Sequence, residues 1–204
     1  ADGSRVLLFA ACQPGPNGRG ISSPLPLAFV LLRNPVRENA KETFAYFHAQ
    51  GVTVKVISGD NPVTVSAAAR EAGIEGADRY VDASTLETYE DIEAACEEYN
   101  VFGRVKPNQK KLLIQALQSN KHTVAMPGDG VNDVLALKEA DCSVAMASGS
   151  DVAAQISDLV LMNSDFSSMP SVVAEGRRVI NNIERAASLY LVKNIFSLIL
   201  AVIS

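Results

Sequence analysis

The 204-residue chain is 48% apolar and 20% charged, and its formal net charge is −5. This composition excludes a disordered chain, because there is enough apolar surface to bury a sizeable core. The negative charge, the few aromatic residues and the lack of a long Lys/Arg run argue against a nucleic-acid partner. The cysteines Cys12, Cys96 and Cys142 have no CxxC spacing, so we predict reduced thiols of a cytosolic protein rather than metal ligands.

Residues 5–11 and 25–32 are two apolar, strand-like runs joined by a loop rich in Pro, Gly, Asn and Ser. No helical pattern separates them. Two strands joined in this way usually pair antiparallel. We therefore predict that residues 1–33 belong to a β-rich unit that differs from the rest of the chain.

From residue 34 onward, runs of β-branched residues alternate with helical patterns. This alternation predicts an α/β fold, in which a parallel sheet carries crossover helices on both faces. The predicted strands are residues 52–57, 79–82, 101–105, 122–126, 142–146 and 158–162. After a first helix, the predicted helices are residues 62–72, 88–99, 107–119, 131–140 and 151–156.

The first helix of this region is predicted from its ends. Asn34 is a suitable cap, and Pro35 fits the first helical position because its fixed φ is already helical. Phe44 and Phe47 then fall on one apolar face, and Gly51 ends the helix.

A further long helix is predicted from about Ser168. It is polar up to Arg185 and largely apolar over residues 186–203, with Lys193 and Asn194 among the exceptions. A membrane-spanning helix needs roughly 20 apolar residues, and the residues after Lys193 cover only about 16 Å at helical rise. The pattern favours the beginning of a transmembrane helix, and an amphipathic helix packed on a soluble core is the alternative.

The segment Met-Pro-Gly-Asp-Gly-Val-Asn-Asp, residues 126–133, carries the strongest chemical signal. Asp129 and Asp133 follow a strand across a glycine-rich turn, and Asn132 or Asp133 can cap the next helix. The carboxyl edge of a parallel sheet is where α/β folds bind ligands. Paired carboxylates at that edge suit Mg²⁺. The simpler interpretation is a turn followed by a helix cap.

Two more residues follow or face predicted strand ends. Ser58 offers a hydroxyl and nearby N–H groups to an anionic oxygen, and Lys110 lies in the first turns of the helix that begins at Pro107. Alone, each is typical of a turn or of a solvated lysine. Together with the paired acids they predict a phosphoryl-transfer site, where catalysis depends on positioning and charge neutralisation.

Several motifs together resemble the phosphorylation domain of P-type cation-transporting ATPases, which belongs to the haloacid-dehalogenase superfamily. They are Ser58-Gly59-Asp60, residues 104–110, Gly128–Asp133, residues 144–146, residues 34–37 and residues 175–183. The resemblance implies an end of the nucleotide-binding domain at 1–33 and a phosphorylation domain at 34–168. It also implies a stalk and the start of the fifth transmembrane helix at 169–204.

The resemblance also implies roles for individual residues. Ser58 would hydrogen-bond the transferred phosphoryl group and Lys110 would neutralise its charge. Asp129 would bind Mg²⁺, and Asp133 and Asn132 would complete that shell or hold the loop that carries the nucleophile. The residues that would contact ATP, or tie the domains together near it, are Arg37, Gly59, Asp60 and Arg104.

The sequence departs from the family pattern at three places. The phosphorylated aspartate of the family lies in Asp-Lys-Thr-Gly-Thr, and this sequence has no such string. Pro127 replaces a usual Thr, which removes a hydroxyl and an N–H beside the metal loop. Asn34 replaces a usual hinge Asp. We therefore expect the chain to begin downstream of the nucleophile and to be inactive when isolated.

These observations predict a piece of an ATP-driven pump in a cell membrane, with this segment mostly cytoplasmic. Its partners would be Mg²⁺, ATP, the membrane, the remainder of the same polypeptide and a transported cation, with a weak preference for Ca²⁺ or another divalent ion. The alternatives are a soluble phosphatase of the same superfamily, or a non-catalytic truncated paralogue that serves as an interaction module.

Overall fold

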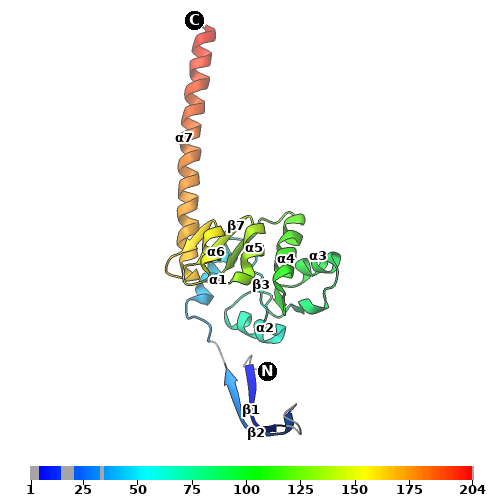
Figure 1. Cartoon of the computed structure of the whole chain (residues 1–204). Coiled ribbons are helices and arrows are strands. Elements are labelled where there is room, and N and C mark those ends of the chain that lie inside the picture. Colours follow the sequence, from blue (N-terminus) through cyan, green and yellow to red (C-terminus); the bar gives the residue numbers. More distant parts are fainter. Residues whose placement is uncertain (1–4, 15–20, 33–34, 204) are drawn as a thin grey trace. The chain divides into compact units, whose positions relative to one another are not determined.

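The structure, a computed structural model, describes residues 5–14, 21–32 and 35–203 (Figure 1). The chain forms two compact units, Ala1–Ser164 and Asp165–Ser204, which are described in turn. Parallel strands with crossover helices, an antiparallel strand pair and a long C-terminal helix are all present. The predicted fold class is therefore confirmed. Asn34 lies outside the described residues.

An antiparallel pair of strands, β1 (Arg5–Pro14) and β2 (Ile21–Leu32), precedes the α/β region. Phe9 pairs with Ala28, and the register shifts directly after Phe9. Apolar side chains of both strands are exposed, among them Phe9 and Phe29. The antiparallel prediction is confirmed, although both strands are longer than the apolar runs.

The first helix, α1 (Ala40–Ala49), begins later than predicted. Pro35 is not helical, so the prediction of a start at Asn34-Pro35 is wrong. The helix begins where backbone bonds first close a turn, because the Ala40 N–H donates to Arg37 O and the Thr43 N–H donates to Asn39 O. A proline fixes only its own φ and cannot itself form that turn. At the other end, Gly51 adopts a φ of 74° as the predicted helix stop.

The first parallel sheet has the order β3-β5-β4. Its strands are β3 (Val56–Ile57), β4 (Tyr80–Asp82) and β5 (Val101–Gly103), and its helices are α2 (Pro62–Glu71), α3 (Tyr89–Glu98) and α4 (Pro107–Ser119). On β5, Val101 joins a core cluster with Val65 of α2, whereas Phe102 joins a cluster with Leu113 of α4. Because successive strand residues point to opposite faces, helices cover both faces of this sheet.

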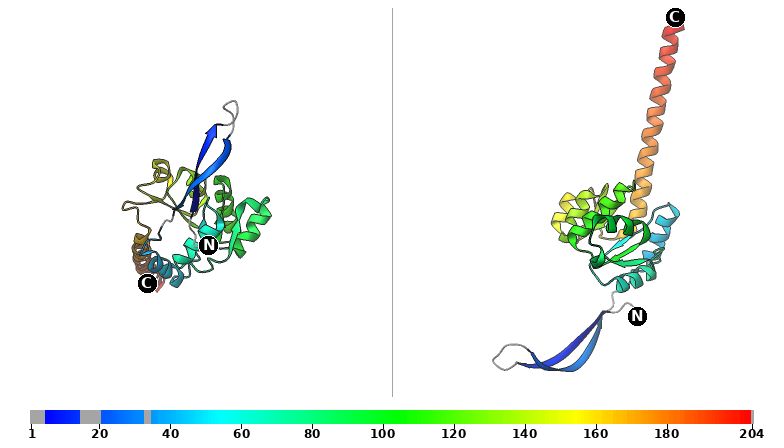
Figure 2. Two further views of the ribbon diagram at one scale, coloured as in Figure 1. Left: turned by 90° about the horizontal axis from the view of Figure 1, so that it is seen from below. Right: turned by 90° about the vertical axis from the view of Figure 1, so that its right-hand side faces the viewer.

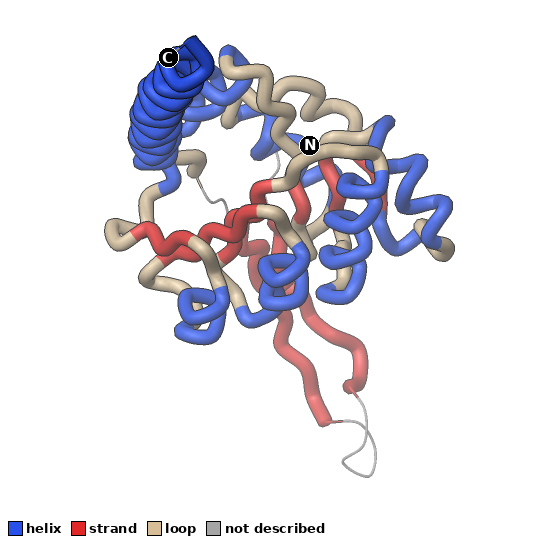
Figure 3. The backbone as a smooth tube through the Cα atoms, turned by 90° about the horizontal axis from the view of Figure 1, so that it is seen from above, coloured by secondary structure: helices blue, strands red, loops and turns tan. Residues whose placement is uncertain are grey.

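The second parallel sheet has the order β6-β7-β8. Figure 3 draws the strands of the chain in red and its helices in blue. Its strands are β6 (Ala125–Gly128), β7 (Cys142–Met146) and β8 (Leu159–Leu161), with η3 (Val131–Asp133), α5 (Val134–Glu139) and α6 (Asp151–Ile156). Ala136, Leu137 and Ala153 pack against Met126 and Ala145 in the main core. The described residues of the predicted parallel α/β region thus form two parallel sheets of three strands each.

The second unit consists of η4 (Phe166–Ser168) and α7 (Met169–Ile203). Figure 2 shows α7 as one continuous helix, and it has 35 residues. Among the described residues it is the one helix that is long and apolar enough to cross a membrane. Leu189, Phe196 and Leu200 illustrate its exposed apolar side chains.

Candidate active site

The centre of the site is an ion pair between two elements that are 23 residues apart in sequence. The Lys110 Nζ, near the N-terminus of α4, lies 2.6 Å from the Asp133 Oδ1, at the end of η3. Both side chains are largely buried, with 14% and 9% of their surfaces exposed. The other oxygen of Asp133 accepts a bond of 3.1 Å from the Gly130 N–H. Both carboxylate oxygens are therefore engaged within the protein.

The turn that carries Asp129 is packed tightly against this pair. A Cβ on Gly128 would lie 2.8 Å from the Cβ of Asp133, so a side chain does not fit there. Asp129 itself is exposed, as is Asn132. The carboxylate of Asp129 is thus exposed, whereas that of Asp133 is buried.

Ser58 directly follows β3. The Ser58 N–H donates to Phe102 O at 2.9 Å, and the Ser58 carbonyl oxygen accepts from the Val105 N–H at 3.0 Å. Its hydroxyl oxygen accepts a bond of 3.1 Å from the Asp60 N–H. A hydroxyl that accepts one bond still carries a proton that can be donated to an anionic oxygen. The backbone of Ser58 is therefore held by β5 and the residues that follow it, and the hydroxyl keeps its donor function.

Arg104 lies beside Ser58 in an unusual conformation. Its φ is 54°, in the left-handed region that non-glycine residues rarely adopt. Its N–H donates to Asp60 O at 2.7 Å, and its guanidinium lies 2.6 Å from Asp82 Oδ2. Hydrogen bonds from Ser84, together with Arg104, hold the pKa of Asp82 below its usual value. The guanidinium is thus tied to β4, and Arg104 and Asp60 lie together.

The other predicted nucleotide contacts are placed differently. Gly59 has only Val105 O, at 3.8 Å, near the position of an added Cβ, so its lack of a side chain is not required for space. Arg37 donates from Nη1 to Ser164 O at 3.4 Å. The structure therefore brings Ser58, Asp60 and Arg104 together and Lys110 with Asp133, whereas Arg37 lies on another segment.

Few side chains of the site are placed to act as metal ligands. Within residues 5–14, 21–32 and 35–203, no group of three or more His, Cys, Asp or Glu side chains is placed to hold a metal ion. Mg²⁺ usually keeps several waters and takes one or two carboxylates together with phosphate oxygens. The single exposed carboxylate of Asp129 fits such an open site, and Asp133 would need to release Lys110 to join it.

A cavity of about 570 Å³ separates the two sheets. The strands β3 and β6 are the end strands of their sheets, and neither pairs with a further strand in the described part of the chain. The cavity, called the β3–β6 cavity below, is lined by Lys55 and Ile57 on one side, by residues 123–127 on the other and by Ile114 and Leu117 of α4. It therefore runs between two strand edges.

The backbone of β3 directs alternate groups into the β3–β6 cavity. The N–H groups of Val56 and Ser58 donate towards β5, to Asn100 O and Phe102 O. Because the hydrogen-bonding groups of successive strand residues point to opposite edges, those of Lys55 and Ile57 point to the cavity.

The same alternation applies to β6. Val124 O accepts from the Cys142 N–H on the β7 side, so Ala125 and Pro127 direct their backbone groups to the cavity. Pro127 has no N–H to offer there, which suits an edge position.

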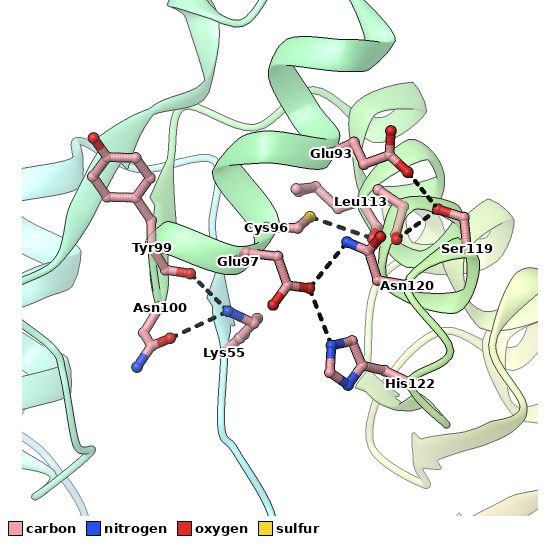
Figure 4. A network of polar contacts seen from close by, with 11 residues as sticks. Lys55, Glu93, Cys96, Glu97, Tyr99, Asn100, Leu113, Ser119, Asn120 and His122 are labelled. Carbon is pink, nitrogen blue, oxygen red and sulfur yellow. Dashed lines mark hydrogen bonds and ion pairs between the residues drawn. The ribbon is translucent and has the colours of Figure 1, made fainter.

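A polar network involves several residues that line the cavity (Figure 4). The Lys55 Nζ donates to Tyr99 O at 2.8 Å and to Asn100 Oδ1 at 3.2 Å. Burial lowers the pKa of Lys55. Nearby, Glu97 Oε1 lies 3.1 Å from His122 Nε2, and that hydrogen bond is the main cause of the lowered pKa of Glu97. The lining of the cavity thus includes the polar side chains of Lys55, Glu97 and His122.

Comparison with known proteins identifies the class of this fold. A family model described as haloacid dehalogenase-like hydrolase matches residues 17–141, more than half of the chain. The chain therefore belongs to the haloacid dehalogenase-like hydrolase family.

Its individual relatives are cation pumps by name. The chain is 50% identical over 204 residues to the probable cation-transporting ATPase exp7 of Streptococcus pneumoniae, which covers 98% of this chain and 26% of that protein. It is 49% identical to the calcium-transporting ATPase CtpE of Mycobacterium tuberculosis, covering 100% of this chain and 26% of that protein. The chain thus spans about a quarter of the length of these curated relatives. The resemblance to P-type cation-transporting ATPases is confirmed over nearly the whole chain.

Solved structures agree on the fold. A zinc-transporting PIB-type ATPase in its E2.Pi state aligns with a TM-score of 0.64 at 24% identity, over 90% of this chain and 24% of that chain. The catalytic domain of the CPx-ATPase CopB-B aligns with a TM-score of 0.54 at 22% identity, over 81% of this chain and 57% of that chain. At these identities the likeness concerns the fold alone.

Three features of the site were not found from the sequence. The partner of Arg104 is Asp82, which the sequence analysis assigned only to a strand. The loop at Gly149 and Ser150 contacts the main chain of Asp129. The one sequence signal for that loop was a glycine between two serines, Ser148-Gly149-Ser150, after the predicted strand 142–146. The β3–β6 cavity had no local signal at all.

Proposed function

We propose that this chain is the phosphorylation segment of a P-type cation-transporting ATPase. The parent protein would transfer the γ-phosphoryl group of Mg·ATP to an aspartate outside this chain and then hydrolyse the acyl phosphate. The observation that carries the proposal is the arrangement of Lys110, Asp133 and Asp129 at the ends of parallel strands, 2.6 Å separating the first two. The identity of 50% to a probable cation-transporting ATPase supports it.

Each residue of the site has a role in this proposal. The Ser58 hydroxyl donates to an oxygen of the transferred phosphoryl group, and the Lys110 ammonium reduces the negative charge around it. Asp133 orients Lys110 and fixes the turn through Gly130 N–H. Asp129 would hold Mg²⁺, with Asn132 exposed beside it. When bound, Mg²⁺ supplies positive charge to the phosphate oxygens.

The nucleotide would be held by residues on the first sheet. Asp60 and Arg104 lie next to Ser58, with Gly59 between Ser58 and Asp60. Arg37, on the segment before α1, would contact ATP from the hinge or tie the domains together. These assignments rest on the resemblance, since Asp82 already takes the Arg104 guanidinium at 2.6 Å.

The same proposal divides the chain into three parts. Residues 1–33 would end the nucleotide-binding domain, residues 34–168 would form the phosphorylation domain, and residues 169–204 would form a stalk and the start of a transmembrane helix. The length and composition of α7 support the last part. The parent would lie in a cell membrane with this segment mostly cytoplasmic. Two relatives named as calcium pumps favour Ca²⁺ as the cation.

The β3–β6 cavity supports a location for the missing acceptor. Both of its long sides are strand edges with backbone groups of Lys55, Ile57 and Ala125 directed inward. An extended segment in this cavity would pair with both edges, and a strand of five or six residues is the usual length. If the segment runs parallel to its neighbours, its carboxyl end emerges between Ser58 and Asp129. An aspartate at that end would meet the phosphoryl group.

The test of the pump proposal is acyl-phosphate formation. The longer protein that contains this chain is incubated with γ-labelled ATP and Mg²⁺, and acid-stable, hydroxylamine-sensitive label is counted. We expect label on the longer protein and none on the isolated chain. Lys110→Ala should greatly reduce the label, whereas the neighbouring Lys111→Ala, whose partner is Glu139 on the surface, should not.

Two other results would replace the proposal. Hydroxylamine-sensitive label on the isolated chain would mean that the acceptor lies within it, as in a soluble phosphatase. No label on the longer protein would favour a non-catalytic module. The cavity is tested separately with a synthetic peptide that contains an apolar run followed by Asp-Lys-Thr-Gly-Thr. Its binding should slow amide hydrogen exchange at Lys55, Ile57 and Ala125, and a peptide N-methylated at alternate residues should not.

A further inference from the structure

The loop that follows β7 closes directly onto the main chain of Asp129. A Cβ built on Gly149 would lie 2.4 Å from Asp129 O and 3.0 Å from both its Cα and its Cβ. Real Cβ atoms do not approach backbone atoms so closely. The φ of Gly149 is not in the left-handed region, so conformational freedom is not what requires a glycine here. The requirement is space for Asp129.

Ser150 adds a hydrogen bond to this close approach. Its N–H donates to Asp129 O over 2.7 Å, one of the short backbone bonds of the structure. Ser150 is also the N-cap residue of α6, although its side chain makes no capping bond. The contact with Asp129 therefore comes from the backbone of Ser150 and depends on the absent side chain of Gly149.

The loop itself is fixed at several points. The Gly149 N–H donates to Met146 O at 2.9 Å, at the end of β7. The Ser148 N–H donates to the Ser164 hydroxyl at 2.8 Å. Beyond the loop, the Ala154 N–H donates to Ser150 O at 3.0 Å and continues α6. A segment bonded in this way to a strand, a helix and Ser164 is a rigid support.

Asp129 needs such a support because of its neighbours in sequence. It lies between Gly128 and Gly130, and glycines leave the chain with more conformations than other residues do. A ligand that required one orientation of the Asp129 carboxylate would have to order this turn when it bound, which weakens binding. A contact that orders the turn beforehand removes that cost.

We propose that Gly149 and Ser150 are positioning residues for Asp129: the bare Cα of Gly149 admits the Asp129 carbonyl to the Ser150 N–H, and this holds the carboxylate for Mg²⁺. The inference rests on the proposed function, because it takes Asp129 as the metal ligand. It adds two residues outside the Gly128–Asp133 turn to the metal site.

Matched variants separate the two contacts. Gly149→Ala introduces the clashing Cβ, and Gly176→Ala, at a glycine of α7 with nothing within 4 Å of an added Cβ, is its control. Ser150→Pro removes the N–H and places a ring carbon in its path, while the φ of −72° at Ser150 suits proline. Ser150→Ala keeps the N–H and is the control for that change.

Two measurements on the full 204-residue chain test the proposal. In the first, Mg²⁺ alone is titrated while the amide signals of Asp129 and Gly130 are followed by NMR. Gly149→Ala and Ser150→Pro should raise the apparent Kd for Mg²⁺ about tenfold or more, and both controls should match the wild type. In the second, without metal, the amide order parameter of Asp129 should fall from about 0.85 towards 0.6 in Gly149→Ala and in Ser150→Pro, and in neither control.

The outcomes distinguish the positioning role of Gly149 and Ser150 from the role of Asp129 as a metal ligand. Wild-type Mg²⁺ affinity and an unchanged order parameter in both test variants would overturn the positioning role, whatever the longer protein does with ATP. A fallen order parameter in a chain that binds no Mg²⁺ would keep the positioning role and reject Asp129 as the metal ligand. If Gly149→Ala does not fold, the Ser150 pair decides alone.

Discussion

Lys110 and Asp133 form a buried bond of 2.6 Å that joins the start of α4 to the turn after β6. Each sheet contributes one partner, since α4 follows β5 and the turn follows β6. The pair therefore fixes the carboxyl ends of the two sheets relative to each other across the β3–β6 cavity. The same bond holds the Lys110 ammonium beside the turn that carries Asp129.

The buried pair should contribute measurably to stability. Lys110→Met leaves the Asp133 carboxylate buried with only the Gly130 N–H, and removing one partner of a buried pair typically costs about 3–5 kcal/mol. Lys111→Met breaks a more exposed pair with Glu139, which is worth about 0–1 kcal/mol. Urea unfolding of both variants measures the difference. Equal losses of unfolding free energy in the two variants would show that the Lys110–Asp133 pair stabilises the fold no more than the exposed pair does.

Arg104 should tolerate glycine better than alanine. Its φ of 54° is strained for any residue with a Cβ, by roughly 1–2 kcal/mol, and both substitutions lose the bond to Asp82 equally. The free energy of unfolding of Arg104→Gly should therefore be about 1 kcal/mol higher than that of Arg104→Ala. Thermal unfolding of the two variants makes the comparison. A more stable alanine variant would mean that the left-handed conformation is not kept.

The three thiols should differ in reactivity. Burial raises the pKa of Cys96 from 9.0 to about 11, and it also raises the pKa of Cys142, whereas Cys12 is exposed. Iodoacetamide at pH 8 should modify Cys12 first and Cys96 only after unfolding, as peptide mass spectrometry would detect. Because the folded chain holds the Cys96 proton more tightly, that contribution to stability is complete below pH 9 and is lost as pH rises through about 11. A stability curve that is flat over this range in wild type, and equal to that of Cys96→Ser, would contradict the assignment.

Asp158 should contribute to acid sensitivity. Its Oδ2 accepts bonds of 2.8 Å from both the N–H and the hydroxyl of Ser143 on β7, and these bonds lower its pKa below 3.8. A carboxylate with a lowered folded pKa stabilises the fold above its ordinary pKa, and this stability is lost as pH falls through the folded value. Asp158→Asn should therefore reduce stability at pH 7 more than at pH 3. Circular dichroism of urea unfolding at both pH values tests this, and equal losses would count against it.

Local patterns were sufficient where the element is defined by its own residues. The helix α4 and the strand β7 have the predicted bounds, because Pro107 marks the helix start and Cys142–Met146 is a buried apolar run. The predicted start of α1 was wrong. Asn34-Pro35 matches the pattern of a helix start, but the backbone closes its first turn at Ala40. Both starts match a local pattern, and the backbone hydrogen bonds of Ala40 and Thr43 select the later one.

The site was predictable only in part. That Lys110 and the Asp129 turn meet follows from parallel strands whose carboxyl ends share an edge. Which carboxylate Lys110 takes could not be read from spacing, because Asp129 and Asp133 both follow the same strand. The support of Asp129 by Gly149 depends on how the loop after β7 packs, and no sequence pattern records that distance.

The open edges of the β3–β6 cavity also bear on how the isolated chain behaves at high concentration. An exposed strand edge can pair with the edge of another molecule, which is a common route to aggregation. The edge of β6 is partly protected, because Pro127 interrupts the row of donors that an incoming strand would need. The edge of β3 has no such proline, so intermolecular association of the isolated chain should begin there, and anything that occupies the cavity should also keep the protein soluble.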